Sequence, residues 1–242
     1  MGFLLSLLKF AKLAPILKAA AFMALSVGVY ALAFGWQFAL GFVLLILVHE
    51  MGHYVAARRL GMDVGLPTFI PFVGAWIQLK DSPLTVEQEA QIAFAGPFMG
   101  TLGTCAVLAL ALQSHSSLLM ALAYSGFFIN LFNLIPISPF DGGRIVAILS
   151  PKVWFLGVPL LFAAWFYVRS PMFLMVLILL APGIWASLRM AWRGEAPAHN
   201  PRYYEVPLDA RIRYGSYYIL LLIFLCVMTY QTHAQVEALR GA

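Results

Sequence analysis

The sequence predicts an all-α polytopic membrane protein, and three observations carry this prediction. Of the 242 residues, 62% are hydrophobic and only 10% are charged, whereas soluble domains average roughly 45 to 50% and 25%. The apolar residues gather in stretches that approach the roughly 20 residues needed to cross a bilayer. Lysine and arginine fall mostly between these stretches. The composition excludes a disordered chain, a nucleic-acid reader and, with 2 cysteines, a disulfide scaffold.

About seven apolar stretches are the expected transmembrane helices of a single domain, 1–242, in which no repeat or low-complexity tract marks a boundary. We expect a catalytic core at about 38–150, followed by additional spans within 153–232. Pro159 and Pro182 predict kinks in two of these later spans. The seven stretches are 19–35, 38–57, 92–112, 117–137, 153–168, 172–192 and 215–232.

The basic residues predict the orientation of these spans, because lysine and arginine collect on the cytoplasmic side of membrane proteins. With the N-terminus inside, only Arg169 and Arg240 of the 15 basic residues lie outside, which favours seven spans and an external C-terminus. A six-helix alternative requires 1–35 to be a signal peptide cleaved near Ala31-Leu32-Ala33. Lys18 leaves only about a dozen apolar residues for such a signal.

The segment between the second and third spans differs from the rest of the chain. Glycines and prolines recur among β-branched and aromatic residues from Gly61 to Lys80, a pattern that excludes a helix. It predicts a short, membrane-associated β-hairpin-like segment near the inner surface. An irregular interfacial loop is the alternative that fits the same pattern.

Three polar residues fall inside the apolar second stretch, where an ionisable group is costly. His49-Glu50-Met51-Gly52-His53 places two histidines at i and i+4, on one helical face, so that both imidazoles can bind one zinc ion. Glu50 lies beside them as a candidate general base. A chance match would not offset the desolvation cost of these side chains, so we expect one Zn²⁺ per chain.

A catalytic zinc needs a third protein ligand and keeps a fourth position for water. Asp141 is the candidate, because it follows Pro136 and Pro139, which end the fourth span, and precedes two glycines that allow a sharp turn. Arg58 lies five residues after His53, about 7 Å along a helix, and Arg144 lies three residues after Asp141. Both halves of the site are therefore expected near the cytoplasmic face.

The paired motifs, His49-Glu50-x-x-His53 and Asn133-x-x-Pro136-x-x-Pro139-x-Asp141-Gly142, resemble the site-2 proteases, which are zinc intramembrane proteases. The resemblance covers about 38–150 and includes Gly96-Pro97 with Gly100. It implies that His49, His53 and Asp141 ligate zinc, that Glu50 is the catalytic acid and base, and that Asn133 positions substrate or stabilises the oxyanion. No stretch is long enough for the PDZ or CBS domains of some relatives.

Cleavage of a transmembrane helix requires local unwinding, and backbone groups freed in lipid must be paired. We expect an exposed strand within 69–79 to pair with the unwound substrate by β-augmentation. Its candidate substrate-binding residues are Phe72, Gly74, Ala75 and Trp76. Asn130 shares a helix face with Asn133 and is expected to bond a neighbouring helix or, alternatively, to act in catalysis. Gly96, Gly100 and Gly103 predict close helix packing.

The expected function is an intramembrane zinc metalloendopeptidase that cuts transmembrane or signal-peptide-like segments near the cytoplasmic face. Its partners would be a transmembrane protein or peptide substrate and the lipid bilayer, with no nucleic acid, and its location a prokaryotic inner membrane. The resemblance implies regulated intramembrane proteolysis or clearance of remnant signal peptides. The alternatives are a catalytically silent relative that binds membrane segments and a metal-handling membrane protein.

Overall fold

The computed structural model describes residues 2–241 except 71–73, 77–82, 84 and 198–199. Within this part the chain is almost entirely helical. Its elements, in chain order, are α1 Gly2–Phe34, α2 Trp36–Arg59, β1 Thr68–Ile70, β2 Gly74–Trp76, α3 Val86–Ser114, α4 Ser117–Asn133, α5 Asp141–Val146, η1 Pro151–Leu156, α6 Gly157–Val168, α7 Pro171–Arg193 and α8 Leu208–Gly241.

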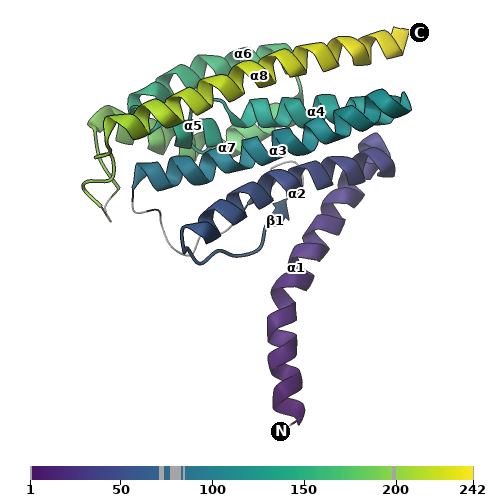
Figure 1. Ribbon diagram of the computed structural model, residues 1–242, viewed down its shortest axis with the longest axis horizontal. Coiled ribbons are helices and arrows are strands. Elements are labelled where there is room, and N and C mark those ends of the chain that lie inside the picture. Colours follow the sequence, from purple (N-terminus) through teal and green to yellow (C-terminus); the bar gives the residue numbers. More distant parts are fainter. Residues whose placement is uncertain (1, 71–73, 77–82, 84, 198–199, 242) are drawn as a thin grey trace.

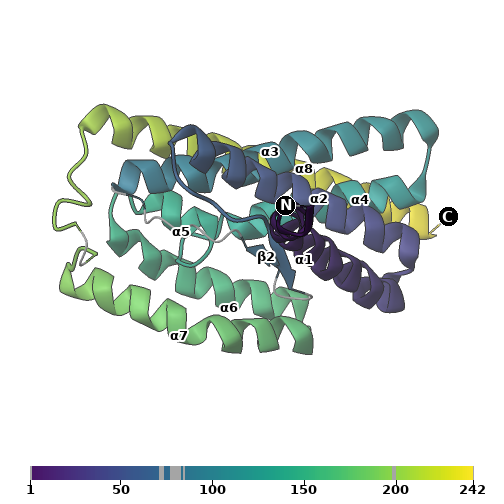
Figure 2. The same ribbon diagram turned by 90° about the horizontal axis from the view of Figure 1, so that it is seen from below.

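Helices α2, α3, α4 and α8 lie side by side, whereas α1 diverges from them toward the N-terminus (Figure 1). Seen from below, α6 and α7 form a further layer on the other side of α5 (Figure 2). Gly35, with φ of 81°, makes the turn between α1 and α2, a conformation that glycine adopts without strain. The N-cap Thr85 accepts a hydrogen bond from the Gln88 amide and begins α3.

In the described part of the chain, six helical segments are long and apolar enough to cross a membrane: 13–34, 36–59, 86–114, 151–168, 173–193 and 208–240. Their outward faces carry exposed apolar residues, such as Leu32, which is 91% exposed, and Ile178, which is 63% exposed. An apolar surface of this extent is typical of helices that face lipid rather than water.

The expected fourth span, 117–137, differs most from the structure. Its helix, α4, stops at Asn133 after 17 residues, and the chain continues as a loop to Phe140. Leu134 and Ile137 in this loop are 1% and 0% exposed, so their hydropathy reflects burial in the protein core. Pro159, for which we expected a kink, lies in the first turn of α6, where a missing amide N–H costs no helical hydrogen bond.

Within its described residues, the segment 61–80 contains two strands of three residues each. They pair antiparallel in the register Thr68 with Trp76, Phe69 with Ala75 and Ile70 with Gly74. β2 contacts α2 and β1 contacts α1. Residues 71–73 and 77–80 of the expected hairpin-like segment lie outside the described residues.

Candidate metal centre

Two histidines one turn apart on α2 face the interior of the helical bundle. His49 and His53 are 5% and 8% exposed, and their Nε2 atoms lie 3.1 Å apart. The i and i+4 spacing brings both rings to one side of the helix. Gly52 lies between them where α2 crosses α3, and a Cβ there would overlap the backbone of Ala95. The absent side chain therefore lets the two helices approach closely.

Asp141, the first residue of α5, completes the cluster from a distant part of the chain. Its Oδ2 atom lies 3.1 Å from Nε2 of His49 and 3.2 Å from Nε2 of His53. Burial by itself would raise the pKa of the Asp141 carboxyl, but His53 and His49 beside it hold that pKa well below its usual range. The carboxyl is therefore charged, as a metal ligand must be.

The turn that presents Asp141 depends on the two glycines that follow it. A Cβ on Gly142 would overlap the carbonyl of Leu134, and one on Gly143 would overlap the backbone of Ile137. The Trp154 indole donates a hydrogen bond of 2.7 Å to the Gly143 carbonyl, which adds a further contact that holds the turn. Bulkier residues would push α5, and with it Asp141, away from the histidines.

The three ligand atoms fit a zinc ion. Tetrahedral zinc binds nitrogen and carboxylate oxygen at about 2.0 to 2.2 Å, so neighbouring ligand atoms are separated by about 3.3 to 3.5 Å. The observed separations of 3.1 to 3.2 Å are close to this edge length. Two imidazoles and one carboxylate also form the donor set of catalytic zinc sites that keep one position open.

The Nδ1–H group of each histidine donates a hydrogen bond to an acceptor in the protein. Nδ1 of His49 lies 2.9 Å from Oδ1 of Asn130 on α4, and Nδ1 of His53 lies 2.8 Å from the Ile92 carbonyl on α3. Both acceptors require a proton on Nδ1, so in the neutral imidazole, which is the form that binds a metal, Nε2 presents its lone pair toward the centre of the cluster. Such contacts orient metal-binding histidines and raise their basicity.

The glycines of α3 make room for this arrangement. A Cβ on Gly96 would overlap the imidazole of His53, and one on Gly100 would overlap the amide of Asn130. Gly103, one turn further, faces Val48. The close helix packing expected from these glycines therefore occurs where α3 passes the candidate ligands and their partner.

Glu50 is 8% exposed and interacts electrostatically with both histidines and with Asp141. Asn133, the other expected catalytic residue, is partly buried, and its amide donates 3.0 Å to the Ile129 carbonyl of its own helix. The residue that reaches His49 is Asn130, one turn earlier. Among the expected substrate-binding residues, Gly74, Ala75 and Trp76 form β2, while Phe72 lies outside the described residues.

A group of charged residues beside Asp141 had no signal in the sequence. Nη1 of Arg144 lies 3.7 Å from Oδ1 of Asp141, and Nε of Arg144 donates 3.1 Å to Glu89 on α3. The other carboxylate oxygen of Glu89 accepts a hydrogen bond from the Tyr203 hydroxyl. These residues are separated by 55 and 114 positions, so no local pattern could connect them.

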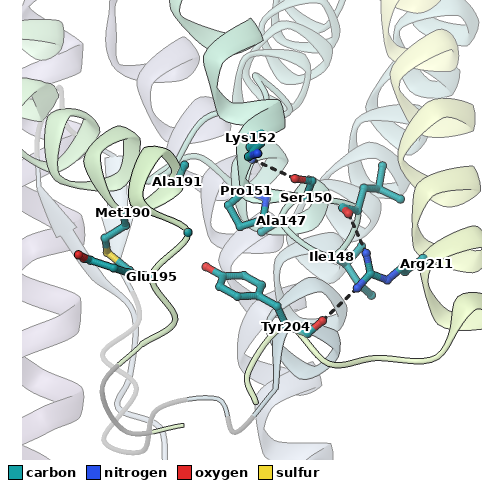
Figure 3. Close-up of a pocket in the computed structure, with 12 residues that line it drawn as sticks. Ala147, Ile148, Ser150, Pro151, Lys152, Met190, Ala191, Glu195, Tyr204 and Arg211 are labelled. Carbon is teal, nitrogen blue, oxygen red and sulfur yellow. Dashed lines mark hydrogen bonds between the residues drawn. The ribbon is translucent and has the colours of Figure 1, made fainter. Parts of the chain in front are cut away.

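A cavity of about 210 Å³ lies apart from these ligands, between the segment that follows α5, the end of α7 and Tyr204. Arg211 closes one side by donating hydrogen bonds to the carbonyls of Leu149 and Tyr204 (Figure 3). None of the candidate metal ligands lines it. The candidate metal cluster and this cavity are therefore separate features.

Comparison with known proteins identifies relatives of this chain. Residues 37–116 match the model of Peptidase family M50. Rip3 from Mycobacterium tuberculosis is 34% identical over 109 residues, which make up 42% of this chain but only 28% of Rip3. MJ0611 from Methanocaldococcus jannaschii is 31% identical over 138 residues, or 48% of this chain and 71% of MJ0611. Both names contain the words zinc metalloprotease.

A solved structure, the site-2 protease from Methanocaldococcus jannaschii, is 20% identical and has a TM-score of 0.45, covering 79% of this chain and 89% of its own. Family membership is established by sequence: the match to MJ0611 is 31% identical and spans more than two thirds of that protein. Six helices within the described residues are apolar enough to cross a membrane, and the chain is an integral membrane protein. It belongs to peptidase family M50, the site-2 protease family.

Proposed function

We propose that this chain is an intramembrane zinc metalloendopeptidase that hydrolyses peptide bonds in transmembrane or signal-peptide-like segments. The observation that carries the proposal is the buried cluster of His49, His53 and Asp141, whose ligand atoms lie 3.1 to 3.2 Å apart. These three residues would hold the metal. Zinc bound there supplies Lewis acidity toward water and toward a peptide carbonyl.

Glu50 is the proposed catalytic acid and base. Its carboxylate takes a proton from the attacking water and later delivers it to the nitrogen of the leaving amine. Its position next to His49 on α2, in a site that is largely closed to solvent, supports this assignment. Low exposure strengthens every charge interaction in the reaction and limits unproductive proton exchange.

Asn133 is the proposed partner of the substrate carbonyl. An amide nitrogen carries two N–H donors, and one of them is used by the Ile129 carbonyl. The second can donate to the oxygen on which negative charge develops during hydrolysis. Asn133 ends α4, at the start of the loop that leads to Asp141, which supports a position beside the reacting bond.

β2 is the proposed docking strand for an unwound substrate. Within the described residues, β2 has β1 as its hydrogen-bonded neighbour on one edge, and its second edge is suited to pair with an extended segment. Gly74, Ala75 and Trp76 supply the backbone groups of this edge, and Phe72 precedes them. Pairing there would satisfy substrate amides that a bilayer leaves without partners.

We place the reaction near the cytoplasmic face of a prokaryotic inner membrane. Arg58 and Arg59 end α2 shortly after His53, and basic residues at a helix end favour the cytoplasmic side. The same rule places the N-terminus inside and, with α4 counted as a seventh span, the C-terminus outside. Regulated proteolysis of a membrane-tethered protein and removal of remnant signal peptides both fit this placement.

Cleavage of transmembrane peptides by the reconstituted protein tests the proposal, with Glu50→Gln as the diagnostic variant. Loss of the base should reduce cleavage about 10²- to 10⁴-fold, while zinc remains bound because the ligands are intact. Glu195→Gln is the matched control, since this carboxylate is exposed and pairs with Arg193. The cleavage rate and the zinc content of this control should both stay at the wild-type value.

Two results would favour the other candidate functions. A zinc-loaded wild type that binds membrane peptides but cuts none of them would indicate a catalytically silent relative. Zinc uptake into vesicles that depends on His49 and His53 would indicate a metal-handling protein. Cleavage by Glu50→Gln at the wild-type rate would contradict the role of Glu50.

A further inference from the structure

The two carboxylate oxygens of Asp141 face different partners. Oδ2 lies 3.1 and 3.2 Å from the histidine nitrogens, whereas Oδ1 lies 3.7 Å from Nη1 of Arg144. A carboxylate can bind a metal through one oxygen or through both. With Oδ1 turned toward a guanidinium, only Oδ2 remains directed at the centre of the cluster.

Arg144 is itself held by residues from two other parts of the chain. Its Nε donates 3.1 Å to Oε1 of Glu89, and Oε2 of Glu89 accepts from the Tyr203 hydroxyl. Tyr203 is 3% exposed, and its carbonyl accepts a 3.0 Å hydrogen bond from the Val86 amide at the start of α3. The guanidinium is therefore held by Glu89 through Nε while its Nη1 faces Asp141.

The charges of this group reinforce one another. Burial would lower the pKa of Arg144, but Glu89 and Asp141 raise it, so the guanidinium stays charged. Burial, followed by Glu89, raises the pKa of Tyr203, so its hydroxyl keeps the proton that it donates. The side chains of Arg144 and Glu89 are 23% and 26% exposed, which makes solvent screening weaker than at an open surface.

We infer that Arg144 is a positioning residue that keeps Asp141 a one-oxygen ligand, with Glu89 and Tyr203 as its support. The inference rests on the metal site of the proposed function. A second oxygen from Asp141 would occupy the position that catalytic zinc keeps open for water or substrate. Such binding would require the carboxylate to rotate so that Oδ1 also faces the metal. Attraction between Arg144 and Oδ1 opposes this rotation.

The test uses the full-length protein in detergent and two readouts that do not depend on activity. Zinc affinity is measured by chelator competition, and the number of ligand atoms by X-ray absorption at the zinc edge. Arg144→Gln should weaken zinc binding about 10- to 100-fold, as loss of a partner of a metal ligand typically does. It should also add an oxygen to the ligand shell.

Two further variants separate positioning from a general loss of stability. Arg144→Lys keeps the charge and should recover part of the affinity, because the contact to Oδ1 is electrostatic at 3.7 Å. Arg213→Gln removes another ion pair to the start of α3, the 2.6 Å contact with Glu87, at a distance from the ligands. This control should keep the wild-type affinity and absorption spectrum.

The outcomes distinguish this inference from the proposed function. A wild type that binds no zinc would overturn both. A wild type that loses zinc on Asp141→Ala but not on Arg144→Gln, with an unchanged spectrum, would overturn only the positioning role. If Arg144→Gln does not fold, Tyr203→Phe is the deciding variant. It should show a changed absorption spectrum and a measurable loss of zinc affinity that stays below about 10-fold. Wild-type affinity and a wild-type spectrum would overturn the inference.

Discussion

Oδ1 of Asn130 lies 2.9 Å from Nδ1 of His49, across the contact between α4 and α2. The amide nitrogen of the same side chain donates 2.7 Å to the Gly126 carbonyl, which determines that the oxygen faces the histidine. In its neutral form, which binds a metal, His49 must therefore carry its proton on Nδ1 and keep the lone pair of Nε2 for the ion. A residue 1% exposed thus sets the tautomer of a candidate metal ligand.

This contact predicts the effect of Asn130→Leu, which keeps the side-chain volume and removes the acceptor. Zinc affinity should fall about 10- to 100-fold, measured by chelator competition on purified protein. Asn133→Leu is the matched control, because Asn133 bonds only within its own helix among the contacts described. It should keep zinc and lose cleavage rate. Equal zinc affinity in both variants would contradict the role of Asn130.

Gly96→Ala tests the close passage of α3 over His53. The new methyl group would overlap the imidazole, so either the ring or the helix must move. We expect a loss of about 1 to 3 kcal/mol of stability from overpacking and a clear loss of zinc affinity. Both are measurable by thermal unfolding in detergent with and without zinc.

Gly183→Ala is the control for this change. Gly183 also lies within a helix, α7, and a Cβ there meets nothing within 4 Å. It should therefore be neutral or slightly stabilising, because alanine favours a helix more than glycine does. Wild-type zinc binding by Gly96→Ala would show that His53 is not constrained by α3.

Tyr218→Phe tests the support of the loop that carries Asp141. The Tyr218 hydroxyl donates 2.8 Å to the buried carbonyl of Leu134, and its loss should cost about 1 kcal/mol. The midpoint of thermal unfolding should fall accordingly. Tyr217→Phe, at the neighbouring, more exposed position, should leave the midpoint unchanged. Identical midpoints in both variants would exclude a supporting role for this bond.

The docking strand leads to a prediction about two adjacent backbone amides. Successive N–H groups of a strand point to opposite edges, and proline removes the donor. Replacing Gly74 and Ala75 together with proline should reduce cleavage of transmembrane peptides while zinc stays bound. Gly74→Ala keeps the N–H and should remain active. Unchanged cleavage by the double variant would refute β-augmentation at this strand.

The sequence alone predicts the parts of the site that local rules govern. His49 and His53 share a helix face because of their spacing, and the two prolines and two glycines around Asp141 predict a helix end followed by a turn. The apolar stretches predict most of the long helices. In these cases a short segment carries its own physical signal.

Other features arise from tertiary contacts that no local pattern encodes. His53 donates to the backbone carbonyl of Ile92. Every residue has such a carbonyl, so the side-chain sequence does not indicate which one accepts this hydrogen bond. Hydropathy does not distinguish the buried loop residues Leu134 and Ile137 from a continuing span. Asn130 and Asn133 lie on one helix face, and only the packing of α4 against α2 decides which of them meets His49.

Zinc content of the detergent-purified protein tests the central claim most directly. We measure zinc per chain in the wild type, in Asp141→Ala and in Asp209→Ala, an exposed aspartate in the first turn of α8. The account predicts about one zinc ion per chain in the wild type and in the control, as for a single three-ligand site, and its loss in Asp141→Ala. Zinc retained at the wild-type level in Asp141→Ala would contradict the proposed centre.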